Sequence, residues 1–228
     1  MMKRVITLAI ALVVLLACVG TVSANLVTNG GFESPVAGYP WTTLYAGNGL
    51  TGWTISPDSG SIDLDHGGWQ SHSGAQSIDL AGDRPATISQ TINTEVGKTY
   101  DLTFWLAGNS YTSDPKSVNV YWDGAKVDSP VTFDVAGKDI FKTDGSYNGW
   151  TKITLSGLKA TKTTTEIAFE QIPSSENLAC GVMLDDISVE LAGNPPTPTP
   201  EFPSTAIPAA MLVGFMGIVL YVQKSKKY

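Results

Sequence analysis

Three aromatic residues stand in stretches rich in glycine, proline and serine, outside the segments with a regular apolar pattern: Trp41, Tyr45 and Trp69. A flat aromatic ring in such a loop can stack against a sugar ring, while nearby Asp or Asn side chains bind the hydroxyl groups. The alternative is that the three rings only pack against the edge of the core. The sequence therefore predicts these three residues as candidate ligand-binding residues.

Residues for catalysis are harder to find. The segment Asp63-x-Asp65-His66 and the second histidine, His72, lack the spacing of a zinc site, and no Gly-x-Ser-x-Gly motif occurs. Two carboxylates could cleave a glycosidic bond, but the sequence does not indicate which two would face each other. Cys180 is expected to be buried and unreactive. We therefore expect a non-catalytic protein, with a hydrolase as a less favoured alternative.

The elements that must position these residues are strands. Apolar and polar residues alternate with a period of two in nine segments, and no stretch between them has a helical period. The pattern predicts an all-β, antiparallel, two-sheet sandwich, and Asp123-Gly124 predicts a tight hairpin turn. The nine segments are residues 61–65, 76–80, 87–92, 100–106, 117–122, 131–135, 151–155, 165–172 and 183–191.

The region between the chain ends is acidic. Residues 25–193 contain 20 Asp and Glu against 9 Lys and Arg, which gives a net charge of −11. Such a surface repels phosphate groups, so we expect no nucleic-acid partner. Only one cysteine lies in this region, so no disulfide can form within it.

Both ends of the chain have the features of targeting segments. Residues 1–24 have the composition of a signal peptide, with cleavage expected between Ala24 and Asn25. Residues 194–203 form a Pro/Thr-rich linker. Residues 204–223, with the uncharged stretch Thr205–Val222, are long enough to cross a membrane, and residues 224–228 form a basic cytoplasmic tail. The β-sandwich domain, residues 25–193, is therefore expected outside the cell.

The C-terminal segment resembles a known sorting signal. The motif Pro200-Glu201-Phe202-Pro203, followed by a hydrophobic helix and a basic tail, is similar to the PEF-CTERM signal of archaeal surface proteins. The resemblance implies that an archaeosortase removes the helix and transfers the protein to a lipid. The alternative is a membrane anchor that is never cleaved.

A second resemblance covers nearly all of residues 25–191. The ordered segments Asn25–Glu33, Leu50–Ile55, Gly74–Gly82 and Leu184–Val189 are similar to the choice-of-anchor C family, which is itself similar to a domain of plant cell-wall proteins. This resemblance implies a galactose-binding-like jelly roll on the cell surface. It implies no particular biochemical activity.

The same resemblance suggests a metal site. Carbohydrate-binding jelly rolls of similar shape open with an Asn-Gly-x-Phe-Glu segment and close with an Asp-Asp strand, and these two ends share a calcium ion. Here the corresponding residues are Glu33 and Asp186. Calcium prefers hard oxygen ligands such as carboxylates and backbone carbonyls. We therefore expect structural Ca²⁺ at Glu33 and Asp186, with Asp185 on the solvent side of its strand; the alternative is that these residues only end a turn and a strand.

Together these features predict a surface-anchored module that binds carbohydrate or envelope glycan without catalysis. The second hypothesis is a structural envelope or adhesion protein that acts through protein–protein contacts. An aromatic-lined cleft would favour the first, and a flat apolar patch the second.

Overall fold

We describe the fold from a computed structural model, which describes residues 24–141 and 149–193. The predicted linker, the motif Pro200–Pro203, the predicted membrane helix and all of the predicted signal peptide except Ala24 lie outside these residues. Within them no helix is present, and hence none that could span a membrane. These described residues belong to one compact unit.

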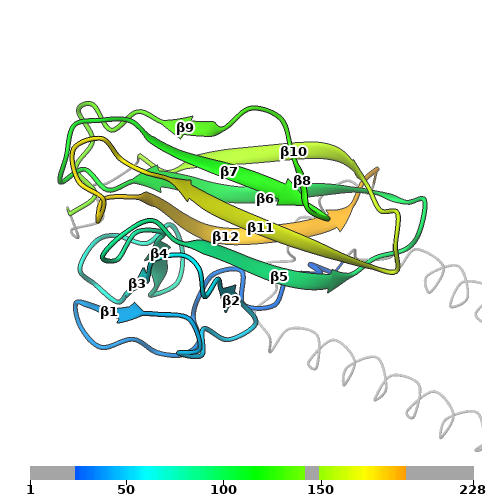
Figure 1. Ribbon diagram of the computed structural model, residues 1–228, viewed down its shortest axis with the longest axis horizontal. Coiled ribbons are helices and arrows are strands. Elements are labelled where there is room, and N and C mark those ends of the chain that lie inside the picture. Colours follow the sequence, from blue (N-terminus) through cyan, green and yellow to red (C-terminus); the bar gives the residue numbers. More distant parts are fainter. Residues whose placement is uncertain (1–23, 142–148, 194–228) are drawn as a thin grey trace, which may run out of the picture. The chain divides into compact units, whose positions relative to one another are not determined.

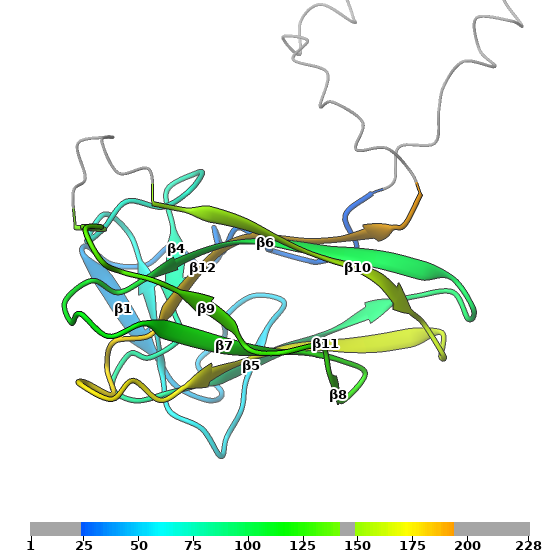
Figure 2. The same ribbon diagram turned by 90° about the horizontal axis from the view of Figure 1, so that it is seen from above.

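The described residues form twelve strands in two antiparallel sheets, which face each other as two layers (Figures 1 and 2). The first sheet has six neighbouring strands: β1 (Trp41–Leu44), β3 (Ile62–Asp65), β4 (Ser77–Asp79), β12 (Val182–Leu191), β6 (Thr99–Gly108) and β10 (Thr151–Lys159). The second contains β2 (Thr54–Ile55), β5 (Thr87–Asn93), β11 (Thr164–Ile172), β7 (Lys116–Trp122) and β8 (Ala125–Lys126), and β9 (Val131–Phe133) also pairs with β7. The predicted all-β, two-sheet fold is confirmed.

Burial alternates along the strands as the period-two pattern predicts. In β6 the side chains of Tyr100, Leu102, Phe104 and Leu106 are all buried on one face. The turn between β7 and β8 uses Asp123 and Gly124, both with positive φ, in agreement with the predicted hairpin. The inward-facing residues of both sheets form one hydrophobic core.

Four aromatic residues form the centre of that core. Phe32 packs against Trp53 with ring centroids 5.7 Å apart, and Trp53 lies 6.2 Å from Phe169. Phe169 in turn meets Phe104 edge to face at 5.2 Å, so this cluster connects the two sheets.

The N-terminal segment closes the sandwich against its last strand. Leu26 N–H donates to the Val189 carbonyl, and Ile187 N–H donates to the Gly30 carbonyl, both at 3.0 Å. Gly30 leaves no room for a side chain, because a Cβ atom there would lie 2.0 Å from the carbonyl oxygen of Ile187. The two ends of the domain are therefore joined in space, as the metal prediction requires.

Candidate functional site

A pocket of about 530 Å³ opens on the outer face of the first sheet, over β1 and β3. Its walls come from these strands and from the loops that follow β3, β4, β6, β9 and β11. The lining combines aromatic rings with short polar side chains, and consists of Trp41, Thr43, Asp63, Trp69, Gly82, Asn109, Tyr111, Phe141, Asn177, Ala179 and Cys180. A concave surface with this mixture is typical of a small-ligand or sugar site.

Two of the three predicted aromatic residues meet at this pocket. The Trp41 ring is 45% exposed and stacks on Trp69, with the ring centroids 6.0 Å apart and the planes at 26°. Trp69 is only 4% exposed, so it mainly packs against the core, in agreement with the packing alternative for these rings. Trp41 belongs to strand β1, and not to a loop as its local composition predicted. Trp41 is therefore the accessible platform, and Trp69 supports it from below.

The position of Trp69 depends on Asp65, the last residue of β3. The fully buried Asp65 carboxylate accepts hydrogen bonds from the backbone N–H groups of Gly67 (3.1 Å), Gly68 (2.8 Å) and Trp69 (3.2 Å). Burial raises the pKa of this carboxyl to about 6, although the three hydrogen bonds oppose the shift. The indole N–H of Trp69 donates to Ser77 Oγ at 2.9 Å, which ties the loop to strand β4.

The polar floor of the pocket is built on paired strands. Asp63 accepts a 2.5 Å hydrogen bond from the Thr43 hydroxyl, and burial is the main cause that raises its pKa. Asp79, the partner of Asp63 in the β3–β4 register, does not line the pocket but accepts a hydrogen bond from the Asn109 amide, which does, at 2.8 Å. Burial raises the pKa of Asp79 to about 8.

Tyr45, the third predicted binding residue, does not line this pocket. Its ring is 48% exposed, and its hydroxyl lies 3.4 Å from Asp83. It borders a smaller hollow of about 240 Å³ formed with the loop 47–50. Tyr45 therefore remains a candidate, but for a separate place on the surface.

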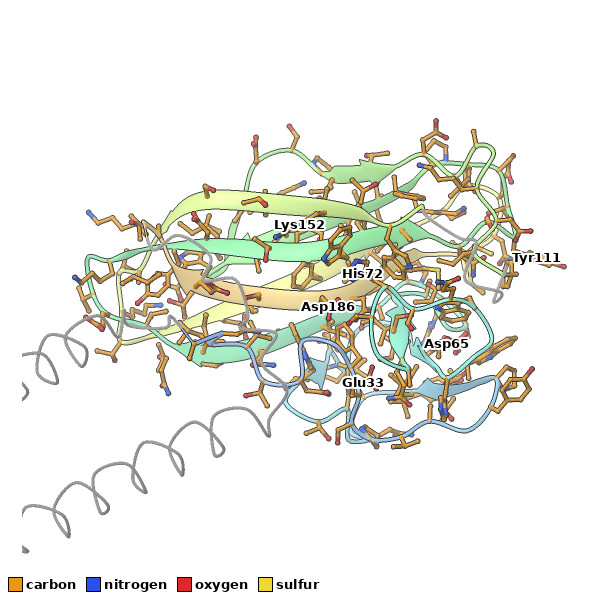
Figure 3. The ribbon with its side chains drawn as sticks, turned by 180° about the vertical axis from the view of Figure 1, so that it is seen from behind. Glu33, Asp65, His72, Tyr111, Lys152 and Asp186 are labelled. Atoms are coloured by element: carbon orange, nitrogen blue, oxygen red, sulfur yellow. The ribbon has the colours of Figure 1, made fainter. Side chains whose placement is uncertain are left out.

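No pattern in the sequence indicated Tyr111, Phe141 or Asn109 as pocket residues. Tyr111 is 76% exposed and Phe141 39% exposed. Figure 3 shows Tyr111 at the end of the sandwich. These residues come from loops far apart in the sequence, and only the fold brings them to one rim. Cys180 also lines the pocket and is buried, as predicted, and its pKa is raised by burial.

A second group of polar residues lies near the middle of the same sheet face, where Figure 3 shows His72 close to Asp186. His72 Nδ1 is 2.6 Å from Asp186 Oδ2, and the Ser73 hydroxyl donates to Asp186 Oδ1 at 2.8 Å. The His72 ring stacks on Trp105 of β6 with centroids 3.7 Å apart. His72, Asp185 and Asp186 each offer a possible ligand atom, and these atoms lie within 4.8 Å of one another.

The strand pattern predicted that Asp185 faces solvent, and this prediction is wrong. Its side chain is fully buried and accepts hydrogen bonds from the backbone N–H groups of His72 (2.9 Å) and Ser73 (3.1 Å). The reason is a register shift between Asp185 and Ser188, with Asp186 at φ 47°, together with the loop that covers this face. Burial, followed by the neighbouring charge of Asp186, raises the pKa of Asp185 to about 8.

Glu33 approaches this group from the other side of the same loop. Its Oε1 atom accepts hydrogen bonds from the backbone N–H groups of Ala75 (2.8 Å) and Gln76 (3.1 Å), and it lies where a Cβ of Gly74 would be. Glu33 does not belong to the described group whose ligand atoms lie within 4.8 Å of one another. Both predicted calcium ligands thus contact the loop 72–76. The carboxylates of Glu33, Asp185 and Asp186 are the hard donors that Ca²⁺ prefers, and a cation would offset the repulsion between Asp185 and Asp186.

Several solved structures are similar to this chain at low sequence identity. A family 35 carbohydrate binding module from Clostridium thermocellum is 16% identical, with a TM-score of 0.41 over 60% of this chain and 90% of that chain. A family 16 carbohydrate binding module is also 16% identical, with a TM-score of 0.44 over 72% and 99% of the two chains. TmCBM61, solved with β-1,4-galactotriose, is 16% identical, with a TM-score of 0.41 over 74% and 99%. No curated protein matches the sequence.

The family comparison covers the whole sandwich. Residues 25–190 match the family described as "Protein of unknown function (DUF642)". This range contains every described strand and ends one residue before β12 does. The chain therefore belongs to the DUF642 family.

Proposed function

We propose that the domain is a non-catalytic carbohydrate-binding module, and that the pocket beside Trp41 is its binding site. The observation that supports this most directly is the half-exposed Trp41 ring, held by the buried Trp69 at the rim of a pocket that also contains Asp63 and Asn109. The ring offers a stacking face for a sugar, and the polar groups offer partners for hydroxyl groups. Among the described lining residues Asp63 is the one acidic side chain, which gives a hydrolase no second carboxylate.

The test is a glycan-array screen of residues 24–193, followed by titration calorimetry of the best ligand with two variants. Trp41→Ala removes the platform, so we expect affinity to fall at least ten-fold, as is common for a well-packed aromatic contact. Tyr45→Ala removes an aromatic ring of nearly equal exposure outside the pocket, so it should leave affinity within about two-fold.

The outcomes separate the alternatives. Loss of binding in Tyr45→Ala but not in Trp41→Ala would move the site to the smaller hollow. A screen with no glycan bound would favour the adhesion hypothesis, in which exposed residues such as Tyr39 (81%) and Val36 (75%) contact another protein.

We further propose that Ca²⁺ binds where Glu33 and Asp186 meet the loop 72–76. The donors are carboxylates, Asp185 is buried beside a like charge, and the described part of the domain has no disulfide, its one cysteine being free. The role of the ion would be structural, since it would tie the first segment of the domain to its last strand.

The location at the cell surface also remains our proposal. Its support is the signal-like N-terminus, the Pro/Thr-rich linker and the Pro200–Pro203 motif before a hydrophobic segment. An archaeosortase-type enzyme would then be a processing partner of the chain.

A further inference from the structure

The described lining of the Trp41 pocket has no cationic side chain. Its one charged group is the carboxylate of Asp63, and the other polar groups are two hydroxyls, two amides, two indole N–H groups and the thiol of Cys180. The positive charge of Lys116 favours the thiolate form of Cys180, but Lys116 does not line the pocket. The fully buried Lys116 ammonium group forms a salt bridge with Asp114 and donates a hydrogen bond to Thr112. That positive charge is therefore already compensated within the protein.

A second negative charge lies near the pocket floor. The carboxylate of Asp83 adds to the negative field at Asp63. Asp79 lies across from Asp63 in the strand pair, but burial raises its pKa to about 8, so it keeps its proton near neutral pH and adds little charge. Arg84 offsets part of the Asp83 charge. An anion in the pocket would therefore meet Asp63 without a described positive group to balance the repulsion.

The hydrogen-bonding groups next to Asp63 have the same bias, whereas the Asn177 amide and the Tyr111 hydroxyl can donate to a neutral or an anionic ligand. The Asp63 carboxylate is a hydrogen-bond acceptor. Its Oδ1 atom already accepts from the Thr43 hydroxyl, which leaves Oδ2 for a donor group of a ligand. The Asn109 amide is held at both ends, since its N–H donates to Asp79 and its oxygen accepts from the Tyr111 backbone at 3.0 Å. A sugar hydroxyl can donate to Asp63, whereas a carboxylate or sulfate has no proton to offer.

We infer that the Trp41 pocket selects uncharged glycans and rejects glycans that carry carboxylate or sulfate groups. This inference rests on the proposed function, since it names the class of ligand for the same site. The Trp41 ring would stack on the face of a sugar, and Asp63 would accept a hydrogen bond from one of its hydroxyl groups. In an acidic sugar a carboxylate or sulfate takes the place of that hydroxyl group, and Asp63 would repel it.

The test uses the full-length chain in a detergent without a sugar headgroup. Cello-, manno- and galacto-oligosaccharides of equal length are titrated, each beside its counterpart in which the C6 hydroxymethyl groups have been oxidised to carboxylates. For the backbone that binds, the carboxylate form should bind about ten-fold more weakly or worse at low salt, as repulsion between like charges at short range predicts. Added salt should narrow the difference, because it screens that repulsion.

The variant Asp63→Asn separates charge from shape. It keeps the size of the side chain and removes its charge, so the difference between the two forms should shrink to about three-fold or less. Asp58→Asn, an exposed residue outside the pocket, serves as the matched control and should leave the difference unchanged.

The possible results are distinguishable. Equal or tighter binding of the carboxylate form overturns this inference and leaves the proposed function intact. A preference for the neutral form that persists in Asp63→Asn overturns the role of Asp63 charge. If none of the oligosaccharides in either form binds, the proposed function and this inference both fail.

Discussion

Asp65 holds the loop that carries Trp69, although it does not line the pocket itself. An amide nitrogen cannot accept a hydrogen bond, so Asp65→Asn should remove at least one of the three hydrogen bonds to the loop 67–69, at a cost of about 0.5–1.5 kcal/mol because the Gly67 end of the loop is open to water. We expect weaker glycan binding together with loss of the circular-dichroism couplet of the stacked Trp41–Trp69 pair. A variant that is destabilised but keeps both the couplet and the affinity would show that Asp65 does not position the platform.

Glu33 is the residue on which the calcium proposal depends. An ion that binds only the folded domain at 100 times its dissociation constant stabilises by about 2.7 kcal/mol, which is roughly 5–10 °C in melting temperature. Glu33→Gln and Asp186→Asn should each remove most of the difference between melting in millimolar calcium and in EDTA. Asp58→Asn is the control, since its exposed side chain lies outside the site.

No calcium-dependent shift in the wild-type domain would end the metal proposal. A shift that survives Glu33→Gln but not Asp186→Asn would place the ion among His72, Asp185 and Asp186 instead.

Backbone hydrogen bonds hold the N-terminal segment against strand β12. Gly30→Ala would place a methyl group against the Ile187 carbonyl, so the segment must shift and the domain should lose about 1–3 kcal/mol of unfolding free energy. Gly38→Ala is the matched control, because its Cβ would meet only Thr42 at an ordinary 3.5 Å. Urea unfolding of both variants makes the comparison, and equal stability would show that the segment is not held at Gly30.

The alternating pattern predicted the long strands because each buries one face against the core. It missed β1, β2 and β8: β2 and β8 have two residues each, too few for a period to be visible, and β1, with the sequence Trp-Thr-Thr-Leu, does not alternate between apolar and polar residues. It also misplaced Asp185, since a bulge interrupts the alternation and a loop covers the outer face there. Trp41 could be predicted from its local composition, but Tyr111 and Phe141 could not, because their approach to Trp41 depends on the packing of distant loops.

For the domain as a whole, buried acids set the dependence of stability on pH. Asp65 and Asp79 have pKa values of about 6 and about 8, above the ordinary 3.8, so the folded state holds their protons more tightly than the unfolded state. The free energy of unfolding should therefore fall as pH rises from about 4 to 8, by up to ~1.4 kcal/mol per pH unit for each group within its window. Denaturant melts in EDTA across this range measure the slope, and Asp79→Asn should flatten it while Asp58→Asn should not. A stability that rises with pH over this range would contradict the burial of these groups.

Processing at the C-terminus concerns the whole chain. If the Pro200–Pro203 motif is a sorting site, the mature protein ends before the Thr205–Val222 segment. Intact mass spectrometry of protein extracted from native membranes should then find no species that contains Tyr228. A species that retains Tyr228 would indicate a membrane anchor that is not cleaved.

Strand β10 ends the first sheet and pairs only with β6 among the described strands. Nine residues of open backbone donors and acceptors invite a second molecule to add its own strand, the first step of edge-to-edge aggregation. Lys152 and Lys159 lie on this strand, and a bulge between Leu155 and Leu158 with Gly157 at φ 75° breaks its regular edge. The two lysines and the bulge therefore oppose the pairing of β10 with a strand of another molecule, which matters most where many copies lie close together. This protection comes from a strand that does not line the pocket.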